Sequence, residues 1–168
     1  IFFFTNSLWA NHTIDSLKAT LKTASDKQRP EILNKLSEAH WEISPRVSLE
    51  YGRQALEEAR KLNLGKKYEA DALHNMGVAY KNLSNYELAL NYHLRALKIR
   101  EDIGDKRAIA DSLHQIGVVY DYSKKINMAL KFHHSALDMR KKIGYKKGIS
   151  DSLHNIGVIN HLSGNYTK

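Results

Sequence analysis

The chain has 168 residues, of which 42% are hydrophobic and 26% are charged, a composition typical of a globular domain and unlike a disordered or collagen-like chain. It contains no cysteine, which excludes a disulfide framework, a thiolate metal site and a cysteine nucleophile. The formal net charge of +8 would attract acidic partners but says nothing about the fold.

The first ten residues (1–10) are expected to be the remnant of a secretory signal peptide. An apolar start, Ile1-Phe2-Phe3-Phe4, precedes Ser7-Leu8-Trp9-Ala10, where cleavage would follow Ala10. A buried N-terminal segment and a membrane anchor are the alternatives. A signal-peptide remnant predicts an extracytoplasmic protein on the periplasmic side. If residues 1–10 are not such a remnant, a cytoplasmic protein is expected. Because the sequence begins without Met and stops inside a repeat, we expect a fragment of a longer protein.

Helices are expected from residue 11 onward. The first, within 11–27, would be capped by Thr13 and carry Ile14 and Leu17 at helical spacing. A divergent helix pair follows over 28–68. Its first helix has Pro30 in the first turn, where a missing N–H costs little. Its second helix, over 45–62, would begin after Ser44 and end near Gly65.

A stretch of eight residues then recurs with a fixed period. The stretch that begins at Asp71 returns at Asp111 and at Asp151, so the period is 111 − 71 = 151 − 111 = 40 residues. Periods of about 20 to 50 residues are typical of helical repeat arrays. Each copy predicts two helices, and the expected ranges are 66–83 with 86–102, 106–122 with 126–142, and 146–163 for a last first helix.

A glycine recurs in the middle of each predicted first helix, at Gly77, Gly117 and Gly157. Glycine inside a helix costs about 1 kcal/mol relative to alanine. We expect a close approach of the partner helix to compensate, which small residues such as Ala89 and Ala96 would also permit. Since one helix pair cannot bury its apolar face alone, stacking of neighbours would form the core.

These residues resemble the tetratricopeptide repeat, in the variety with longer repeats. The pattern is a large residue (Leu73), an apolar residue before glycine (Met76-Gly77), an aromatic (Tyr80), and Ala89 with Ala96. The resemblance is strong over 69–168, where the last repeat is truncated after its first helix. It is weaker over 28–68, where Ser37 stands in place of the glycine and His40 in place of the aromatic residue. It implies an all-α fold, a right-handed helix-turn-helix solenoid.

The resemblance also implies a function. Members of this family mostly bind proteins or peptides on a concave surface lined by the first helices. The chain is also similar to the N-terminal part of bacterial signalling regulators, in which such an array precedes a membrane helix and a histidine kinase or DNA-binding output. The main expectation is therefore a protein- or peptide-binding scaffold module of a larger protein, and the alternative is an extracytoplasmic sensory input domain.

The candidate groove residues lie beside the core face of the predicted first helices, where carboxylates and imidazoles would hold peptide amides and valines would give apolar contacts. The structural alternative is that Asp favours the helix N-terminus and His caps a neighbouring carbonyl. The candidates are Asp71, His74, Asn75, Val78 and Lys81; Asp111, His114, Gln115, Val118 and Asp121; and Asp151, His154, Asn155 and Val158.

Other chemistries are disfavoured by the sequence. Asp and His recur three residues apart, but neighbouring helix axes are about 10 Å apart, which places too few ligands at one point for zinc. No phosphate loop, nucleophilic triad or carboxylate pair stands out, so we expect no enzyme and no cofactor.

Basic residues recur at the repeat corners, as at Lys106-Arg107 and Lys146-Lys147. Binding of nucleic acid would require aromatic residues interleaved with these basic residues, so it is a less favoured alternative to protein or peptide binding.

Overall fold

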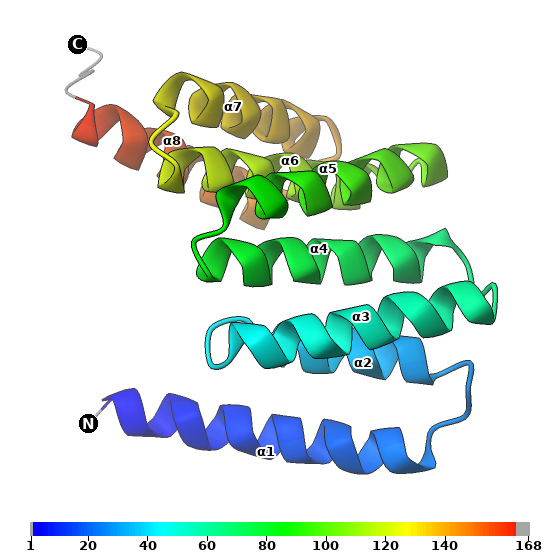
Figure 1. Ribbon diagram of the computed structural model, residues 1–168. Helices are drawn as coiled ribbons and strands as arrows, with labels where there is room; N and C mark the ends of the chain where they lie inside the picture. The colour runs from blue at the N-terminus through cyan, green and yellow to red at the C-terminus, as the bar shows by residue number, and fades with distance from the viewer. Residues whose placement is uncertain (1, 164–168) are drawn as a thin grey trace. The chain divides into compact units, whose positions relative to one another are not determined.

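The computed structural model describes the backbone of residues 2–163 and the side chains of residues 12–163. The described chain is entirely helical apart from short connections, which confirms the all-α helical repeat fold (Figure 1). The predicted signal-peptide remnant at 1–10 lies outside the described side chains. None of the described helices is both long and apolar enough to cross a membrane. The chain divides into two compact units, Ile1–Asn85 and Tyr86–Lys168.

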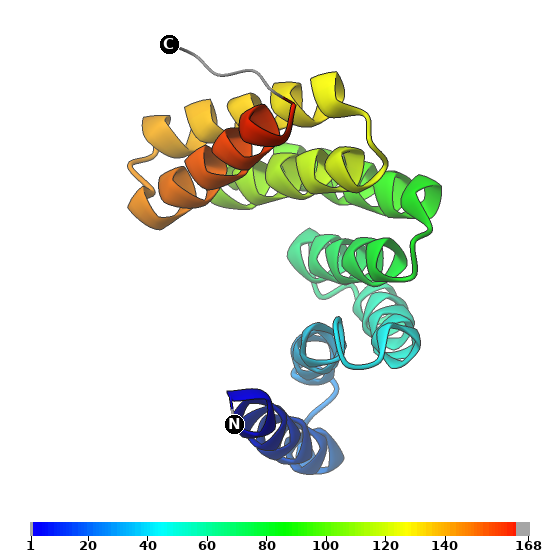
Figure 2. The ribbon, with the colours of Figure 1, turned by 90° about the vertical axis from the view of Figure 1, so that its left-hand side faces the viewer.

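The first unit holds four helices, each antiparallel to the next (Figures 1 and 2). They are α1 (Phe2–Thr23), α2 (Arg29–Ala39), α3 (Pro45–Lys61) and α4 (Lys66–Asn82). Proline stands in the first turn of both α2 and α3, as predicted. Helix α1 begins well before Thr13, which lies inside it. The prediction that Thr13 caps the first helix is therefore wrong, because the apolar residues before it continue the helix.

The second unit holds α5 (Tyr86–Ile103), α6 (Lys106–Tyr122), α7 (Ile126–Lys142) and α8 (Lys146–Leu162). Their bounds agree with the predicted ranges to within one residue. Asp105 caps α6, since its carboxylate accepts a hydrogen bond of 3.0 Å from the Ala108 N–H. Gly104 and Gly144 follow α5 and α7 with φ of 76° and 68°, the left-handed conformation that ends many helices.

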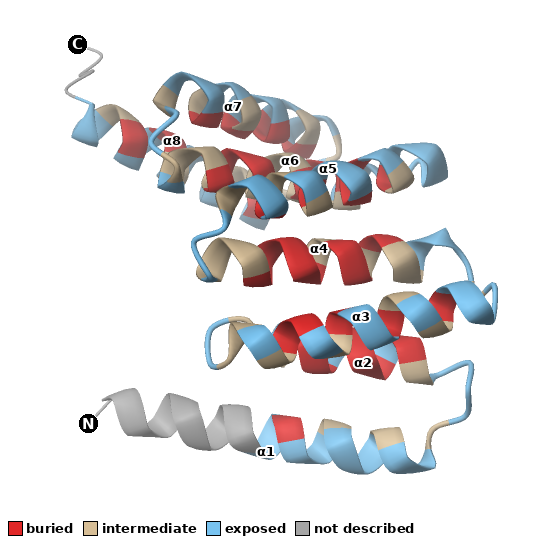
Figure 3. Ribbon diagram, in the orientation of Figure 1, coloured by how far each residue is buried: buried red, intermediate tan, exposed pale blue. Residues whose placement is uncertain are grey.

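Each unit has its own core between the helices, where Figure 3 shows the buried faces. In the first unit, Leu33 packs with Ala55 and Ala72. In the second, Leu97, Ile109 and Ile116 pack together. The aromatic rings of Tyr120 and Phe132 stack beside them, with centroids 5.4 Å apart. The repeated leucine, isoleucine and alanine positions therefore build these cores.

The close helix approach predicted at the recurring glycines is confirmed at Gly117. A Cβ there would lie 2.9 Å from the Cε1 and Nδ1 atoms of His133 on α7, so only glycine fits beside the imidazole ring. At Gly157 a Cβ would meet no described atom within 4 Å, and because the last repeat is truncated after its first helix, the prediction is not tested there. The histidine that covers Gly117 lies 133 − 117 = 16 residues after it, on the second helix of the same repeat.

Helix α8 should be the least protected helix of the second unit. Leu153 and Val158 on α8 are 51% and 40% exposed, whereas the equivalent Leu113 and Val118 on α6 are half-buried. Helices with few buried apolar contacts open more readily. We therefore expect amide hydrogens of 150–162 to exchange faster than those of 110–122, measured by hydrogen exchange with mass spectrometry. Equal protection in the two helices would contradict this expectation.

Candidate functional site

The predicted groove residues of α4 lie at its contact with α2. Asn75 and Val78 are buried, and Asp71, His74 and Lys81 are half-buried. The Asn75 Nδ2 donates a hydrogen bond of 2.9 Å to the backbone oxygen of Asn34 on α2. The ring of His74 lies 6.0 Å from that of Trp41. On this helix, Asn75 therefore fixes α4 against α2, and the half-buried residues border the contact.

The ammonium of Lys81 lies in this partly enclosed region. Burial lowers the pKa of Lys81 from its ordinary value, and the nearby carboxylate of Glu42 opposes the shift. Next to it, the Asn82 Nδ2 donates a hydrogen bond of 2.6 Å to the Trp41 backbone oxygen. The indole Nε1 of Trp41 is buried with no hydrogen-bond partner among the described residues. This end of the α2–α4 contact therefore holds a half-buried ammonium and a buried indole N–H.

In the second unit the candidates Asp111 and His114 of α6 meet a buried arginine of α7. The Arg140 Nη2 lies 2.8 Å from the Asp111 carboxylate, and Arg140 is only 3% exposed. The Arg140 Nη1 lies 3.4 Å from the His114 Nδ1. An arginine can only donate, so this contact requires an unprotonated Nδ1 on His114. These two candidates consequently hold α6 against α7.

The same arginine reaches the first turns of α8. Its Nη1 donates hydrogen bonds of 2.8 Å to the Ser152 hydroxyl and 2.9 Å to the Gly148 carbonyl. One repeat earlier, Arg100 donates a bond of 2.8 Å to the Ser112 hydroxyl. This buried Arg–Ser pair was not predicted from the sequence, although both partners recur at the 40-residue period, twelve residues apart. That recurrence was the signal that could have revealed it.

The imidazole of His114 packs on that of His133, with ring centroids 5.1 Å apart and an edge-on arrangement. Burial lowers the pKa of His114 to about 3, and the charges of Arg140 and His133 add to the shift. Burial also lowers the pKa of His133 to about 4, which the carboxylate of Asp121 partly opposes. Both histidines are therefore neutral near pH 7, and they suit packing better than anion binding.

The unfolding free energy should fall as the pH is lowered from about 7 to 4. The two histidines have folded-state pKa values of about 3 and about 4, below the ordinary value of about 6.5. The unfolded chain therefore takes up protons first, and their contribution is complete only above about pH 6.5. We expect His133→Gln to flatten this pH dependence in urea titrations. An unchanged slope would contradict the neutral, buried state of His133.

The candidates on α8 are the most accessible ones. Asp151, His154 and Val158 are exposed, and Asn155 is half-buried with its Nδ2 3.5 Å from the His114 Nε2. On α6, Gln115, Val118 and Asp121 are half-buried. The second unit therefore brings the α6 and α8 candidates to neighbouring helices, with His114 and Asn155 at their contact. The exposed α8 residues form the part of this surface that a partner could reach.

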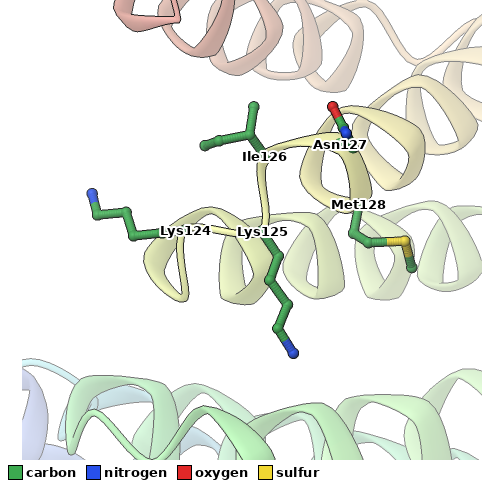
Figure 4. Close-up of a pocket in the computed structure, with 5 residues that line it drawn as sticks. All are labelled: Lys124, Lys125, Ile126, Asn127 and Met128. Carbon is green, nitrogen blue, oxygen red and sulfur yellow. The ribbon is translucent and has the colours of Figure 1, made fainter.

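A further surface hollow lies at the turn between α6 and α7. It is lined by Lys124, Lys125, Ile126, Asn127 and Met128 (Figure 4). The hollow is shallow, and the side chains of Lys124 and Lys125 extend from it in different directions. None of the candidate groove residues lines it. In the described part of the chain, no three His, Asp or Glu side chains are grouped so that they could hold a metal ion.

Known proteins support the repeat assignment. Residues 68–142 match the family described as tetratricopeptide repeat. No curated protein sequence matches the chain. A Rap protein complexed with competence and sporulation factor has a similar structure, with a TM-score of 0.84 and 18% identity; the match covers 91% of this chain and 44% of that one.

Two further solved structures share the fold. MamA has a TM-score of 0.59 and 21% identity over 93% of this chain and 80% of its own. A signal transduction ATPase with numerous domains from Pyrococcus horikoshii, which has a tetratricopeptide repeat sensor, has a TM-score of 0.64 and 18% identity over 89% of this chain and 30% of its own. The chain thus spans less than half the length of the Rap protein and of the ATPase.

Proposed function

Because residues 68–142 belong to the tetratricopeptide-repeat family, we propose that this chain is the protein- or peptide-binding scaffold module of a larger protein, with the partner held along the first helices of the repeats. This module acts by binding and not by catalysis. Its partner lies across α6 and α8 in the second unit, where the candidate residues Gln115, Val118, Asp151, His154 and Val158 are at least partly accessible.

One observation carries the proposal. On α8, the exposed Asp151, His154 and Val158 follow one another at three and four residues, so they lie on one face of the helix. A carboxylate, an imidazole and an apolar side chain on one exposed face can hold the amides and one side chain of an extended peptide. The likeness to a Rap protein complexed with competence and sporulation factor supports a fold that can carry a bound factor.

The test is selection from a displayed library of random 12-residue peptides, followed by affinity measurement on the enriched peptides. The Asp151→Ala/His154→Ala/Val158→Ser variant should bind them at least about tenfold more weakly. His134→Ala, an exposed histidine on α7, is the control and should leave the affinity unchanged. Because the three substituted residues and His134 are all exposed, we expect the helicity of both variants to equal that of the wild type. No enriched peptides, or equal loss in the control, would overturn the proposal.

A second candidate function is a sensory input domain of a bacterial signal-transduction protein, located outside the cytoplasm. It is supported by the similar ATPase, in which a tetratricopeptide repeat part is the sensor. The full-length gene distinguishes the two functions. A membrane helix followed by a kinase or DNA-binding output favours the sensor, whereas further repeats alone favour the scaffold.

A further inference from the structure

Two corners of the second unit have the same backbone. One joins α5 to α6 and the other joins α7 to α8. Gly104 N donates a hydrogen bond of 3.0 Å to the Glu101 carbonyl, and Gly144 N donates one of 3.1 Å to the Lys141 carbonyl. Both glycines have positive φ. The two corners therefore differ in their side chains alone, and each serves as a reference for the other.

The charges of these two corners are opposite. Three positions that are acidic in the first corner, Glu101, Asp102 and Asp105, are Lys141, Lys142 and Tyr145 in the second. Both corners then continue with two basic residues, Lys106-Arg107 and Lys146-Lys147. The first corner carries 2 − 3 = −1 charge, whereas the second carries 4 − 0 = +4. The lysines 141, 142, 146 and 147 are called the cationic corner below.

Carboxylates lie near the cationic corner, with Asp138 and Asp151 one helical turn away from its lysines, but the structure shows no ion pair between them and these lysines. All four lysines are exposed, and none forms an ion pair with a residue that the structure describes. The carboxylate that caps α6 in the first corner is replaced by Tyr145, which gives α8 no side-chain cap. Charges grouped in this way without partners raise the local potential and attract an oppositely charged partner.

The turn of the cationic corner is also packed against the side chains of two arginines. The guanidinium of Arg107 lies 4.2 Å from the centre of the Tyr145 ring, and that of the buried Arg140 lies 5.9 Å from it. Gly148 leaves room for this packing, since a Cβ there would be 2.5 Å from Tyr145 and 2.7 Å from the Arg140 Nε. The backbone of the turn that carries the lysines is therefore already ordered. Binding of a partner then costs little conformational entropy for this turn.

We propose that the cationic corner is a docking surface for an acidic protein segment, a run of several Asp and Glu residues. It adjoins the proposed groove, whose exposed α8 residues begin at Asp151, four residues after Lys147, but it involves none of the groove residues. Lysines suit carboxylates as flexible point charges, whereas the one exposed arginine nearby, Arg107, is stacked on Tyr145. A short acidic stretch can contact all four lysines, which lie within seven consecutive positions.

Nucleic acid and membrane surfaces fit the corner less well. A nucleic-acid strand needs a continuous basic track and accessible aromatic rings. Glu101, Asp102 and Asp105 interrupt the basic residues along this edge, and the Tyr145 ring is half-buried under Arg107. An anionic membrane would require apolar side chains that insert beside the lysines, and the one isoleucine in the turn, Ile143, is half-buried.

The test uses fluorescence anisotropy with a labelled peptide of twelve glutamates, in 20 mM and 150 mM salt. The wild-type chain is compared with Lys141→Glu/Lys142→Asp, which introduces the residues of the first corner and is therefore compatible with the backbone. The matched control is Lys124→Glu/Lys125→Asp at the α6–α7 turn, which changes the net charge by the same −4. A 12-nucleotide single strand and vesicles with phosphatidylserine are tested in parallel.

We expect the corner variant to bind the peptide at least about tenfold more weakly, while the control loses less than about twofold. The affinity should fall as the salt concentration rises. Equal losses in both variants would overturn the proposal, because binding would then depend on net charge alone. Tighter binding of the nucleotide strand or of the vesicles than of the peptide would overturn it as well, as would the absence of peptide binding.

Discussion

Replacing Gly117 with leucine is expected to destabilise the chain by about 3 kcal/mol, the upper end of the usual cost of overpacking a core. The new side chain would start 2.9 Å from the ring of His133. That ring cannot move aside easily, because His133 is only 1% exposed and packs edge-on against His114. Urea unfolding followed by circular dichroism at 222 nm measures the change.

The repeat provides a matched control for this substitution. Gly157 occupies the same position in the last repeat, but a Cβ there meets nothing within 4 Å. Gly157→Leu should leave the stability unchanged or raise it by up to about 1 kcal/mol, since leucine favours helix more than glycine does. If both variants lost equal stability, the contact between Gly117 and His133 would not be the cause.

Replacing Arg140 with methionine is expected to cost about 3 kcal/mol. Arg140 is 3% exposed and joins Asp111, Ser152 and the Gly148 carbonyl. Removing one partner of a buried polar cluster leaves the other groups desolvated, which typically costs about 3–5 kcal/mol. We take the lower end because the Asp111 side chain is 39% exposed and can regain water.

A second substitution tests whether the buried Arg–Ser pair is the cause. The divergent repeat is shifted by one residue in its second helix. Arg100 therefore corresponds to Ala59, 41 residues earlier, and Ser112 corresponds to Ala72, 40 residues earlier; both alanines are buried. Alanine at both positions is therefore compatible with this helix contact. Arg140→Met combined with Ser152→Ala should recover about 1 kcal/mol of the loss, because the buried hydroxyl no longer lacks a partner. Strictly additive losses would contradict the pairing.

The helices could be predicted from the sequence because their ends are determined locally. Pro45, Asp105, Gly104 and Gly144 act on the backbone next to them, and the structure places the helix ends where these residues predict. The start of α1 could not be predicted in this way. Thr13 is a good cap residue, but a cap forms only where the preceding chain leaves the helix, and here it continues.

The contacts of the candidate site depend on the distance between helices, which the repeat pattern does not give. The sequence predicted that Gly117 allows a close approach, but not that an imidazole fills the space. It did not predict the bond between Arg100 and Ser112. In the divergent repeat the glycine is on the second helix instead: a Cβ added to Gly52 of α3 would lie 3.3 Å from the Oγ of Ser37 on α2. Such differences become visible once the helices are paired in space.

Chemical-shift mapping tests the central claim, that a partner binds along the first helices, most directly. An enriched peptide is titrated into the isotope-labelled 19.2 kDa chain while backbone amide signals are followed. We expect the largest shifts in 111–121 of α6 and 151–158 of α8, with little change in the exposed residues of α5 and α7. Shifts concentrated on α5 and α7, with α6 and α8 unchanged, would contradict the account.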